Sequence, residues 1–423
     1  MHIVFFNRSF HPDVSATGQL LTDLCEDLVR EHGCRVSVIT GPPLNPPAGY
    51  ELPRGFVSRD SYRGIEIHRA SGTRFDKRRF AGRAANYVSY FLSACWAGLR
   101  VDRPTMVVAL TDPPIIGLAA LVAGARFRAP LVMLFQDLFP EVTALLPDFH
   151  SGTINAALQR INCFLCRRAT RIIALGQTME RRLIENKGAD PDKITVIANW
   201  ADTTAISPGP KRNAFSEAHG LADTFVVMHS GNIGLSQNLE TIVDAAALLR
   251  DMPDVTFVFQ GEGVKKAELQ QRTSALGLSN VRFLPYADKR LLGESFASAD
   301  CFIVSLQQGL AGYIVPSKLY GILASGRPYV AAVEPDCEVT TLTRQYDCGL
   351  IAEPGSARDL ADKVMALYRD RDLAGRLGQN ARSAGLSFDR RSQVARYAEL
   401  FRGVADAPVV GCSVAGVRGA AQP

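Results

Sequence analysis

The residues best suited to chemistry in this sequence lie where short apolar runs end. Pro316-Ser317-Lys318 opens a helical stretch that Ser325-Gly326-Arg327-Pro328 closes. A lysine in the first turn of a helix opposes the helix dipole, which favours an anion there, so its presence indicates that it meets one. We therefore predict that Lys318 binds phosphate; the alternative is a lysine that only faces solvent.

Two glycine-rich turns offer further places for an anion. One apolar run leads into Ser230-Gly231-Asn232-Ile233-Gly234, and the next ends in Gln260-Gly261-Glu262-Gly263. Glycines between a strand and a helix let backbone N–H groups approach an anion at the positive helix end. We predict a ligand at both turns, and plain turns without a ligand are the alternative. Glu338 follows a later strand at the same end and offers a carboxylate to ribose hydroxyls.

Two carboxylates follow an apolar run in the first half of the chain. Asp137 and Glu141 come after the run 131–135, with Pro140 between them. Either one is placed to orient or deprotonate a hydroxyl group, as a general base does. A helix-capping aspartate with a surface glutamate is the alternative, and Asp112 is another candidate base.

Apolar, β-branched runs alternate with longer helical patterns along almost the whole chain. This rhythm is typical of βα units that form parallel sheets, so we predict an α/β fold with two doubly wound domains. The predicted strands are 2–6, 35–39, 64–69, 105–110, 131–135, 171–175 and 194–197, then 225–229, 255–260, 281–283, 301–305, 329–332 and 349–351. The predicted helices of the first half are 18–31, 80–99, 154–167 and 178–186. Ligands of such sheets bind outside the carboxyl ends of the strands, where the residues named above lie.

The seam between the two domains is predicted near residue 205. Asn199-Trp200-Ala201-Asp202 runs there into Ser207-Pro208-Gly209-Pro210, which breaks both periodicities. This gives a first domain at 1–204, a second at 205–386 and a last helix at 387–403. Residues 404–423 contain few large apolar groups, so we expect a disordered tail.

Composition excludes several classes of protein. Hydrophobic residues make up 47% and charged residues 21%, as in folded globular proteins, and a net charge of +5 is too small for wrapping nucleic acid. No GxGxxG follows the first strand and no lysine follows a glycine, which argues against dehydrogenases and P-loop NTPases. Nine scattered cysteines predict reduced thiols, and without metal-ligand spacing we expect no metal. The first residues carry no signal-peptide pattern, which predicts a cytoplasmic protein.

A basic segment precedes an apolar run that is too short to span a bilayer. Residues 74–83 hold five basic side chains against one acidic one, and residues 84–99 carry no charge. Such a pattern is typical of a helix at an anionic membrane surface. A buried helix with a solvated basic start and a nucleic-acid contact are the alternatives. The candidate membrane contacts are Lys77, Arg78, Arg79, Arg83 and Trp96.

Together these motifs resemble the retaining nucleotide-sugar glycosyltransferases of glycosyltransferase family 4. That family has the GT-B fold, in which two Rossmann-like domains face each other across a cleft. The resemblance covers the chain to about residue 403, and it is closest to the fucosyl- or fucosaminyltransferase-like enzymes of colanic-acid, capsule and O-antigen gene clusters. It rests on Ser15-Ala16-Thr17-Gly18, Asp137-Leu138-Phe139-Pro140-Glu141, Asn199-Trp200-Ala201-Asp202, the two glycine turns, and the stretch from Pro316 to Pro328.

The resemblance implies that the second domain binds a nucleotide diphosphate sugar and the first domain a glycan acceptor, with the last helix crossing back to the first domain. It also implies transfer with retention, no metal, and stabilisation of charge on the departing phosphate. A lipid-linked acceptor would place the protein at the inner face of the cytoplasmic membrane. The implied catalytic residues are Asp137, Glu141 and Lys318. The implied donor contacts are Gly18, Gly231, Asn232, Gln260, Gly261, Glu262, Gly263, Pro316, Ser317, Lys318 and Glu338.

The sequence departs from the family at two places. The family's paired glutamates fall on Tyr313 and Gly321, and its basic pair after the phosphate turn falls on the uncharged residues 235–238. Lys318 is then the main predicted cation, with Arg327 as a further candidate. Two alternatives to a transferase stay open: a sugar-nucleotide epimerase of the same fold, and a non-catalytic nucleotide-binding subunit.

Overall fold

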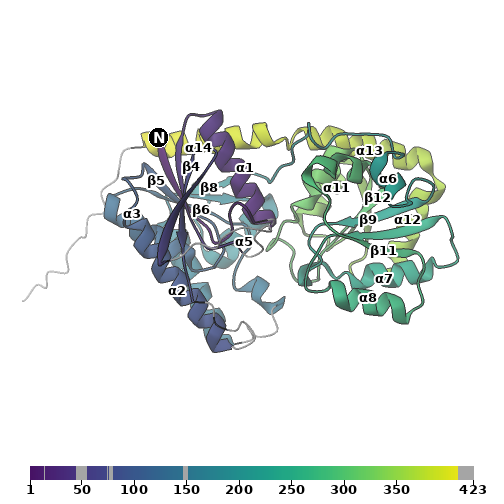
Figure 1. The fold of residues 1–423 in the computed structure, drawn as a ribbon, viewed down its shortest axis with the longest axis horizontal. Coiled ribbons are helices and arrows are strands. Elements are labelled where there is room, and N and C mark those ends of the chain that lie inside the picture. Colours follow the sequence, from purple (N-terminus) through teal and green to yellow (C-terminus); the bar gives the residue numbers. More distant parts are fainter. Residues whose placement is uncertain (14, 44–54, 74, 76–79, 146–150, 408–423) are drawn as a thin grey trace, which may run out of the picture.

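Two β-sheets, each covered by helices, make up the structure and lie next to each other along its longest axis (Figure 1). The structure is a computed structural model that describes residues 1–13, 15–43, 55–73, 75, 80–145 and 151–407. The predicted α/β fold with two doubly wound domains is confirmed.

The first sheet has eight strands in the order β3-β4-β2-β1-β5-β6-β7-β8. All neighbours pair in parallel except β3 with β4. Its strands are β1 (His2–Phe6), β2 (Arg35–Thr40), β3 (Val57–Tyr62), β4 (Ile65–Ala70), β5 (Met106–Ala109), β6 (Leu131–Leu134), β7 (Arg171–Ala174) and β8 (Ile194–Val196). The helices between them are α1 (Ala16–Arg30), α2 (Phe80–Gly98), α3 (Ile116–Phe127), α4 (Gly152–Arg168) and α5 (Gln177–Lys187), with short 3-10 helices η1 (Glu141–Leu145) and η2 (Pro191–Lys193).

The second sheet has six parallel strands in the order β11-β10-β9-β12-β13-β14. Its strands are β9 (Phe225–Ser230), β10 (Val255–Gln260), β11 (Val281–Leu284), β12 (Cys301–Ser305), β13 (Tyr329–Ala332) and β14 (Gly349–Ala352). Its helices are α6 (Ala214–Ala218), α7 (Glu240–Leu248), α8 (Lys266–Ala275), α9 (Leu292–Ala297), α10 (Lys318–Ser325), α11 (Glu338–Tyr346), α12 (Ala357–Arg369) and α13 (Arg371–Leu386), with η3 (Leu235–Gln237) and η4 (Lys289–Leu291).

The central strands are buried on both faces. In β1, Ile3 and Phe5 belong to one core cluster, while Val4 and Phe6 belong to another, because successive side chains of a strand point to opposite faces. Strands covered on both sides have continuous apolar sequences. This burial explains why the predicted strands match β1, β10, β12 and β13 to the residue.

The hairpin of β3 and β4 differs from the prediction, which contained no strand at β3. The side chains of β3 are exposed or half-buried at the sheet edge, so no apolar pattern marks the strand. Arg63 and Gly64 form its turn, with φ angles of 48° and 81°. Two consecutive positive φ angles fit the tight turns that join antiparallel strands.

The chain crosses between the two sheets twice, and the crossings are hydrogen-bonded to each other. The N–H of Ala201 donates to the carbonyl of Phe388 at 3.2 Å, and the N–H of Arg390 donates to the carbonyl of Ala201 at 2.9 Å. α14 (Arg390–Asp406) then lies along the first domain, where Tyr397 and Phe401 join its core (Figure 1, yellow). The helix extends past residue 403, so the predicted tail begins too early; residues 408–423 lie outside the described part.

Candidate active site

Lys318 lies on the Gly231 turn at the carboxyl end of the second sheet. It is the first residue of α10, in agreement with its predicted place in a first helical turn. A Cβ built on Gly231 would lie 3.4 Å from its Cε and 3.6 Å from its Nζ. Its Nζ lies 3.2 Å from Nε2 of His229 in β9. The Gly231 turn and the start of α10, which lie 87 residues apart in the sequence, therefore meet at the ammonium group of Lys318.

The ammonium of Lys318 has no carboxylate partner among the described residues. Other lysines near the same edge of the sheet are paired: Lys265 contacts Glu240 at 2.5 Å, and Lys266 contacts Glu262 at 2.7 Å. Burial lowers the pKa of Lys318 to about 7, because the charged amine loses water without gaining a counter-ion. The site thus contains a cation whose natural partner is an anion from outside the chain.

The two glycine turns pack backbone against backbone. A Cβ on Gly261 would lie 1.9 Å from the carbonyl oxygen of Gly231, and one on Gly263 would lie 2.2 Å from that of Ile233. Both glycines also have positive φ angles, 149° and 158°. Only glycine allows so close an approach, so these residues are needed to hold the turns together.

Most N–H groups of the Gly231 turn are already used inside the protein. Gly231 donates to the carbonyl of Gln260 at 2.9 Å, Ile233 to that of Glu262 at 2.8 Å, and Gly234 to Oε1 of Gln237 at 3.1 Å. Three of the backbone N–H groups predicted to approach an anion therefore already have acceptors within the protein. The N–H of Asn232 is the one without an internal acceptor in the described part of the chain.

The other predicted donor contacts of this domain surround the turns. Gln260 is buried, its Oε1 accepts from Ser295 at 2.6 Å, and its Nε2 has no partner. Asn232 and Glu262 are exposed. Pro316 and Ser317 accept backbone hydrogen bonds from the first turn of α10, which fixes the direction of Lys318.

Asp137 lies where the loops of the two domains touch. It forms a β-bridge with Ile314, and the N–H of Leu138 donates to the carbonyl of Tyr313 at 2.9 Å. The N–H of Asp137 also points to Oγ1 of Thr111 at 3.3 Å. Burial, with a smaller effect of Asp112, raises the pKa of Asp137 to about 6. A carboxyl group with that pKa suits a general base near neutral pH.

Glu141 has a different environment from Asp137. Both its carboxylate oxygens accept from Nζ of Lys187 at 2.9 Å, and the Lys187 side chain is fully buried. The same ammonium donates to the carbonyl of Phe139 at 2.7 Å. Both carboxylate oxygens of Glu141 are bound to a buried ammonium, so its surroundings favour a role in fixing the loop that carries Asp137.

Glu338 reaches across to the first domain. Its Oε2 accepts from both the N–H and the hydroxyl of Thr178 at 3.3 Å, at the N-terminus of α5. A Cβ on Gly176 would lie 2.3 Å from that carboxylate. The predicted ribose contact would require the carboxylate to leave this place. In the structure, the Glu338 carboxylate links the two domains through Thr178, next to the ion pair of Arg181 with Asp336.

Arg327 and Gly18, two further candidate residues, form hydrogen bonds within the protein. Arg327 donates to the carbonyls of Gly209 at 3.0 Å and Ala297 at 2.5 Å, so it secures the segment between the domains and does not replace the missing cations near the Gly231 turn. Gly18 donates its N–H to Oγ of Ser15, the N-cap of α1, at 3.3 Å. The structure leaves the predicted phosphate contact of Gly18 untested.

The two positions that lack the family's glutamates have other roles. Tyr313 accepts a hydrogen bond from Asn186 at 2.9 Å, and the guanidinium of Arg182 lies 5.1 Å from its ring centroid. Gly321 is buried, and a Cβ there would lie 3.2 Å from the ring of Phe296. Position 313 thus joins the domains, and position 321 belongs to the apolar packing of α10.

Sequence reasoning missed His229 and Lys187. In the sequence, His229 is the last residue of a predicted strand, and its one signal is a polar side chain at the end of an apolar run, next to a glycine turn. Lys187 closes a helical pattern in the sequence like any surface lysine. Its burial follows from contacts with a loop 46 residues away, which no local pattern shows.

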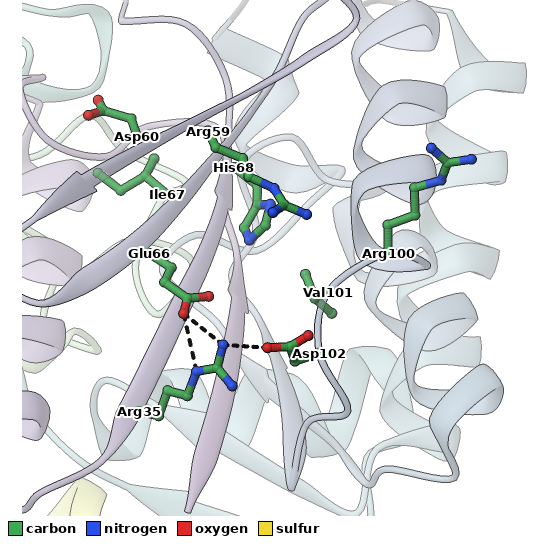
Figure 2. A pocket seen from close by; sticks show the side chains of 9 residues that line it. All are labelled: Arg35, Arg59, Asp60, Glu66, Ile67, His68, Arg100, Val101 and Asp102. Carbon is green, nitrogen blue, oxygen red and sulfur yellow. Dashed lines mark hydrogen bonds and ion pairs between the residues drawn. The ribbon is translucent and has the colours of Figure 1, made fainter.

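A pocket of about 270 Å³ lies at another place, at the edge of the first sheet (Figure 2). Its charges are largely balanced by each other: Arg35 contacts Glu66 at 2.7 Å and Asp102 at 2.5 Å, while Arg100 turns away from the other lining residues. We assign no ligand to it.

Neither a metal cluster nor a membrane-spanning helix is found in the described residues. They contain no group of three or more His, Cys, Asp or Glu side chains that could hold a metal ion. None of their helices is long and apolar enough to cross a membrane. Of the candidate membrane contacts, Lys77, Arg78 and Arg79 and the side chain of Arg83 lie outside the described part, and Trp96 is 45% exposed.

Two Rossmann-like domains whose loops meet beyond the strand ends define the GT-B class of architecture. Comparison with known proteins agrees. Residues 16–200 match the family model "Glycosyl transferase 4-like domain", and residues 211–384 match "Glycosyl transferases group 1". The chain belongs to the glycosyltransferases built from these two domains.

Individual relatives are similar at low identity. The probable glycosyltransferase WbjE of Pseudomonas aeruginosa is 27% identical over 68% of this chain and 72% of that protein. The putative colanic acid biosynthesis glycosyl transferase WcaI of Escherichia coli is 24% identical over 85% of this chain and 90% of that protein. The solved structure of Anabaena HepE in complex with UDP-glucose covers 95% of this chain and 100% of its own, with a TM-score of 0.72 and 20% identity.

Proposed function

We propose that this protein transfers a hexose or deoxyhexose from a nucleotide diphosphate sugar to a lipid-linked glycan acceptor, with retention and without a metal ion. The setting would be the synthesis of a bacterial exopolysaccharide, capsule or O-antigen at the inner face of the cytoplasmic membrane. The name of the relative WcaI, which refers to colanic acid biosynthesis, supports this setting.

The observation that carries the proposal is the ammonium of Lys318. It lies on the Gly231 turn beyond the ends of β9 and β10, and no carboxylate of the described residues neutralises it. A dianionic diphosphate is the ligand that such a charge fits. The unpartnered Nε2 of Gln260 offers one more donor at the same edge of the sheet.

The chemistry would be mainly electrostatic. As the bond from the anomeric carbon to the phosphate oxygen breaks, negative charge collects on the departing diphosphate, and the Lys318 ammonium stabilises it. The acceptor hydroxyl attacks on the same face and gives its proton to the departing phosphate oxygen. Asp137, whose pKa burial raises to about 6, would orient that hydroxyl from the first domain.

The surface of α2 supports a membrane-associated acceptor. Val88, Leu92 and Trp96 follow each other at intervals of four residues and are 53%, 56% and 45% exposed. Arg100 lies with its guanidinium 3.5 Å from the Trp96 ring centroid. An apolar stripe bordered by cations is typical of helices in a membrane interface.

The first test is thermal stabilisation by UDP, GDP, dTDP, ATP and NAD, each with and without a chelator. One nucleoside diphosphate at about 100 times its dissociation constant is expected to stabilise the protein by roughly 2.7 kcal/mol. Lys318→Met is expected to lose the effect, while Lys363→Met, at a half-buried lysine of α12 outside the proposed donor site, is expected to keep it.

The products then distinguish the alternatives. Transfer of radiolabelled sugar from the selected donor to polyprenyl-diphosphate glycans would support the proposal. Epimerisation of the donor without acceptor would identify an epimerase, and binding without release of nucleotide diphosphate would identify a non-catalytic subunit. Absence of binding to every diphosphate would refute the proposed donor site.

A further inference from the structure

His229 and Lys318 form a buried pair of two bases. The side chain of His229 is 1% exposed, and its Nε2 lies 3.2 Å from Nζ of Lys318 and 3.4 Å from the carbonyl oxygen of Asn232. Its Nδ1 is buried and has no hydrogen-bond partner. In most proteins a buried ammonium is held by a carboxylate; here a neutral ring takes that place.

In the described part of the chain, no carboxylate is bonded to either member of the pair. The ring of Phe259 in β10 lies 6.0 Å from the His229 ring. Glu262, which follows β10 in the second glycine turn, is paired with Lys266 at 2.7 Å. Burial and the charge of Lys318 hold the pKa of His229 well below its usual value, so its ring is neutral.

A neutral ring has one lone pair to offer the lysine. Lys318 as an ammonium can donate to Nε2 only in the tautomer whose ring proton is on Nδ1, and in that tautomer the contact of Nε2 with the carbonyl of Asn232 is not a hydrogen bond. The hydrogen bond from Lys318 to Nε2 directs the amine without reducing its charge. A carboxylate at the same place would direct it equally well but would cancel the charge that an anion needs.

We propose that His229 is a positioning residue of the donor site, where it holds the Lys318 ammonium toward the diphosphate and leaves its positive charge unneutralised. The inference rests on the proposed function, because it names the support of the same site. Binding is then coupled to protonation: above neutral pH, a free amine takes one proton from the buffer when the diphosphate binds.

The test is isothermal titration calorimetry with UDP-, GDP- and dTDP-hexoses between pH 6 and 9, in buffers of different ionisation enthalpy. The diphosphates of these donors are esterified at both ends and do not titrate in this range. For the wild type we expect uptake of close to one proton per donor at pH 8.5. We also expect affinity to fall about tenfold per pH unit above pH 7.

Three variants separate positioning from packing. His229→Phe removes the acceptor, and we expect about tenfold to hundredfold weaker binding at pH 7 and a midpoint of the pH profile shifted to lower pH. His229→Gln keeps a neutral acceptor and should retain most of the affinity. His229→Glu keeps an acceptor but neutralises Lys318, and should bind as weakly as Lys318→Met.

The outcomes separate the two proposals. Circular dichroism and unfolding midpoints identify variants that do not fold, and His229→Gln serves as the folded comparison. If the wild type binds a donor but His229→Phe has the same pH profile and proton uptake, the role of His229 is refuted while the donor site stands. If the wild type binds none of the donors at any pH, both proposals are refuted.

Discussion

Replacing Glu141 by Gln tests whether this residue serves as a base or as structural support. The carboxylate is 22% exposed, whereas the side chain of Lys187, its partner, is fully buried. Glu141→Gln therefore leaves a buried ammonium without a counter-charge, which costs about 3–5 kcal/mol in the free energy of unfolding. Lys187→Met removes the charge itself and leaves Glu141 near water, so its cost is smaller, about 1–3 kcal/mol from unpaired acceptors such as the carbonyl of Phe139.

A variant that changes both Glu141 and Lys187 tests whether the uncompensated buried charge is the cause of the lost stability. Replacing both members of a buried ion pair by uncharged residues is often nearly neutral, so Lys187→Met with Glu141→Gln should be more stable than Glu141→Gln alone. Urea unfolding at pH 7 measures all four proteins, and Glu399→Gln on the exposed face of α14 is the matched control. Unchanged stability of Glu141→Gln, together with loss of turnover, would refute the structural role and restore Glu141 as a base.

Three further predictions concern other parts of the molecule. Asp137→Asn is expected to abolish turnover, and to stabilise the fold at pH 7 by up to about 3 kcal/mol, because burial raises the pKa of Asp137 to about 6 and penalises its charged form. The gain should shrink as the pH falls below about 6 and disappear below about pH 3, where that carboxyl is protonated in both states. A gain that persists there would contradict this cause. Gly261→Ala should cost more than about 3 kcal/mol in urea unfolding, because its Cβ would lie 1.9 Å from the carbonyl oxygen of Gly231. Leu92→Ser with Trp96→Ser should reduce co-sedimentation with anionic liposomes without lowering donor affinity, and equal co-sedimentation would rule out the α2 surface as the membrane contact.

The fold was predictable from the sequence because its strands are buried on both faces. Continuous apolar runs such as 255–260 identify these strands without reference to neighbours. β3 was not predictable in this way, since its polar residues at the sheet edge are held by pairing with β4. Local pattern therefore identified the interior of each sheet better than its edge.

The candidate site was predictable only where a local rule applied. A lysine in the first turn of a helix is unusual on electrostatic grounds, and it led to Lys318. Glu141 and Glu338 fit an equally simple rule, yet the structure pairs the first with Lys187 and the second with Thr178. The type of a residue and its place after a strand do not determine which distant side chain reaches it.

The uncharged residues at the two positions where the family resemblance implies glutamates, together with the unpaired Lys318, have a common electrostatic consequence. With Tyr313 and Gly321 at the positions of the family's carboxylates, no acidic side chain of the described residues lies near enough to neutralise Lys318. In the proposed donor site, the Lys318 ammonium would then act on a diphosphate without a competing carboxylate. A glutamate at position 321 would bring a charge against Phe296 and Ile206, where it would lose water without gaining a partner. The charge of the proposed donor site thus depends on Lys318 and on the neutral ring of His229 beside it.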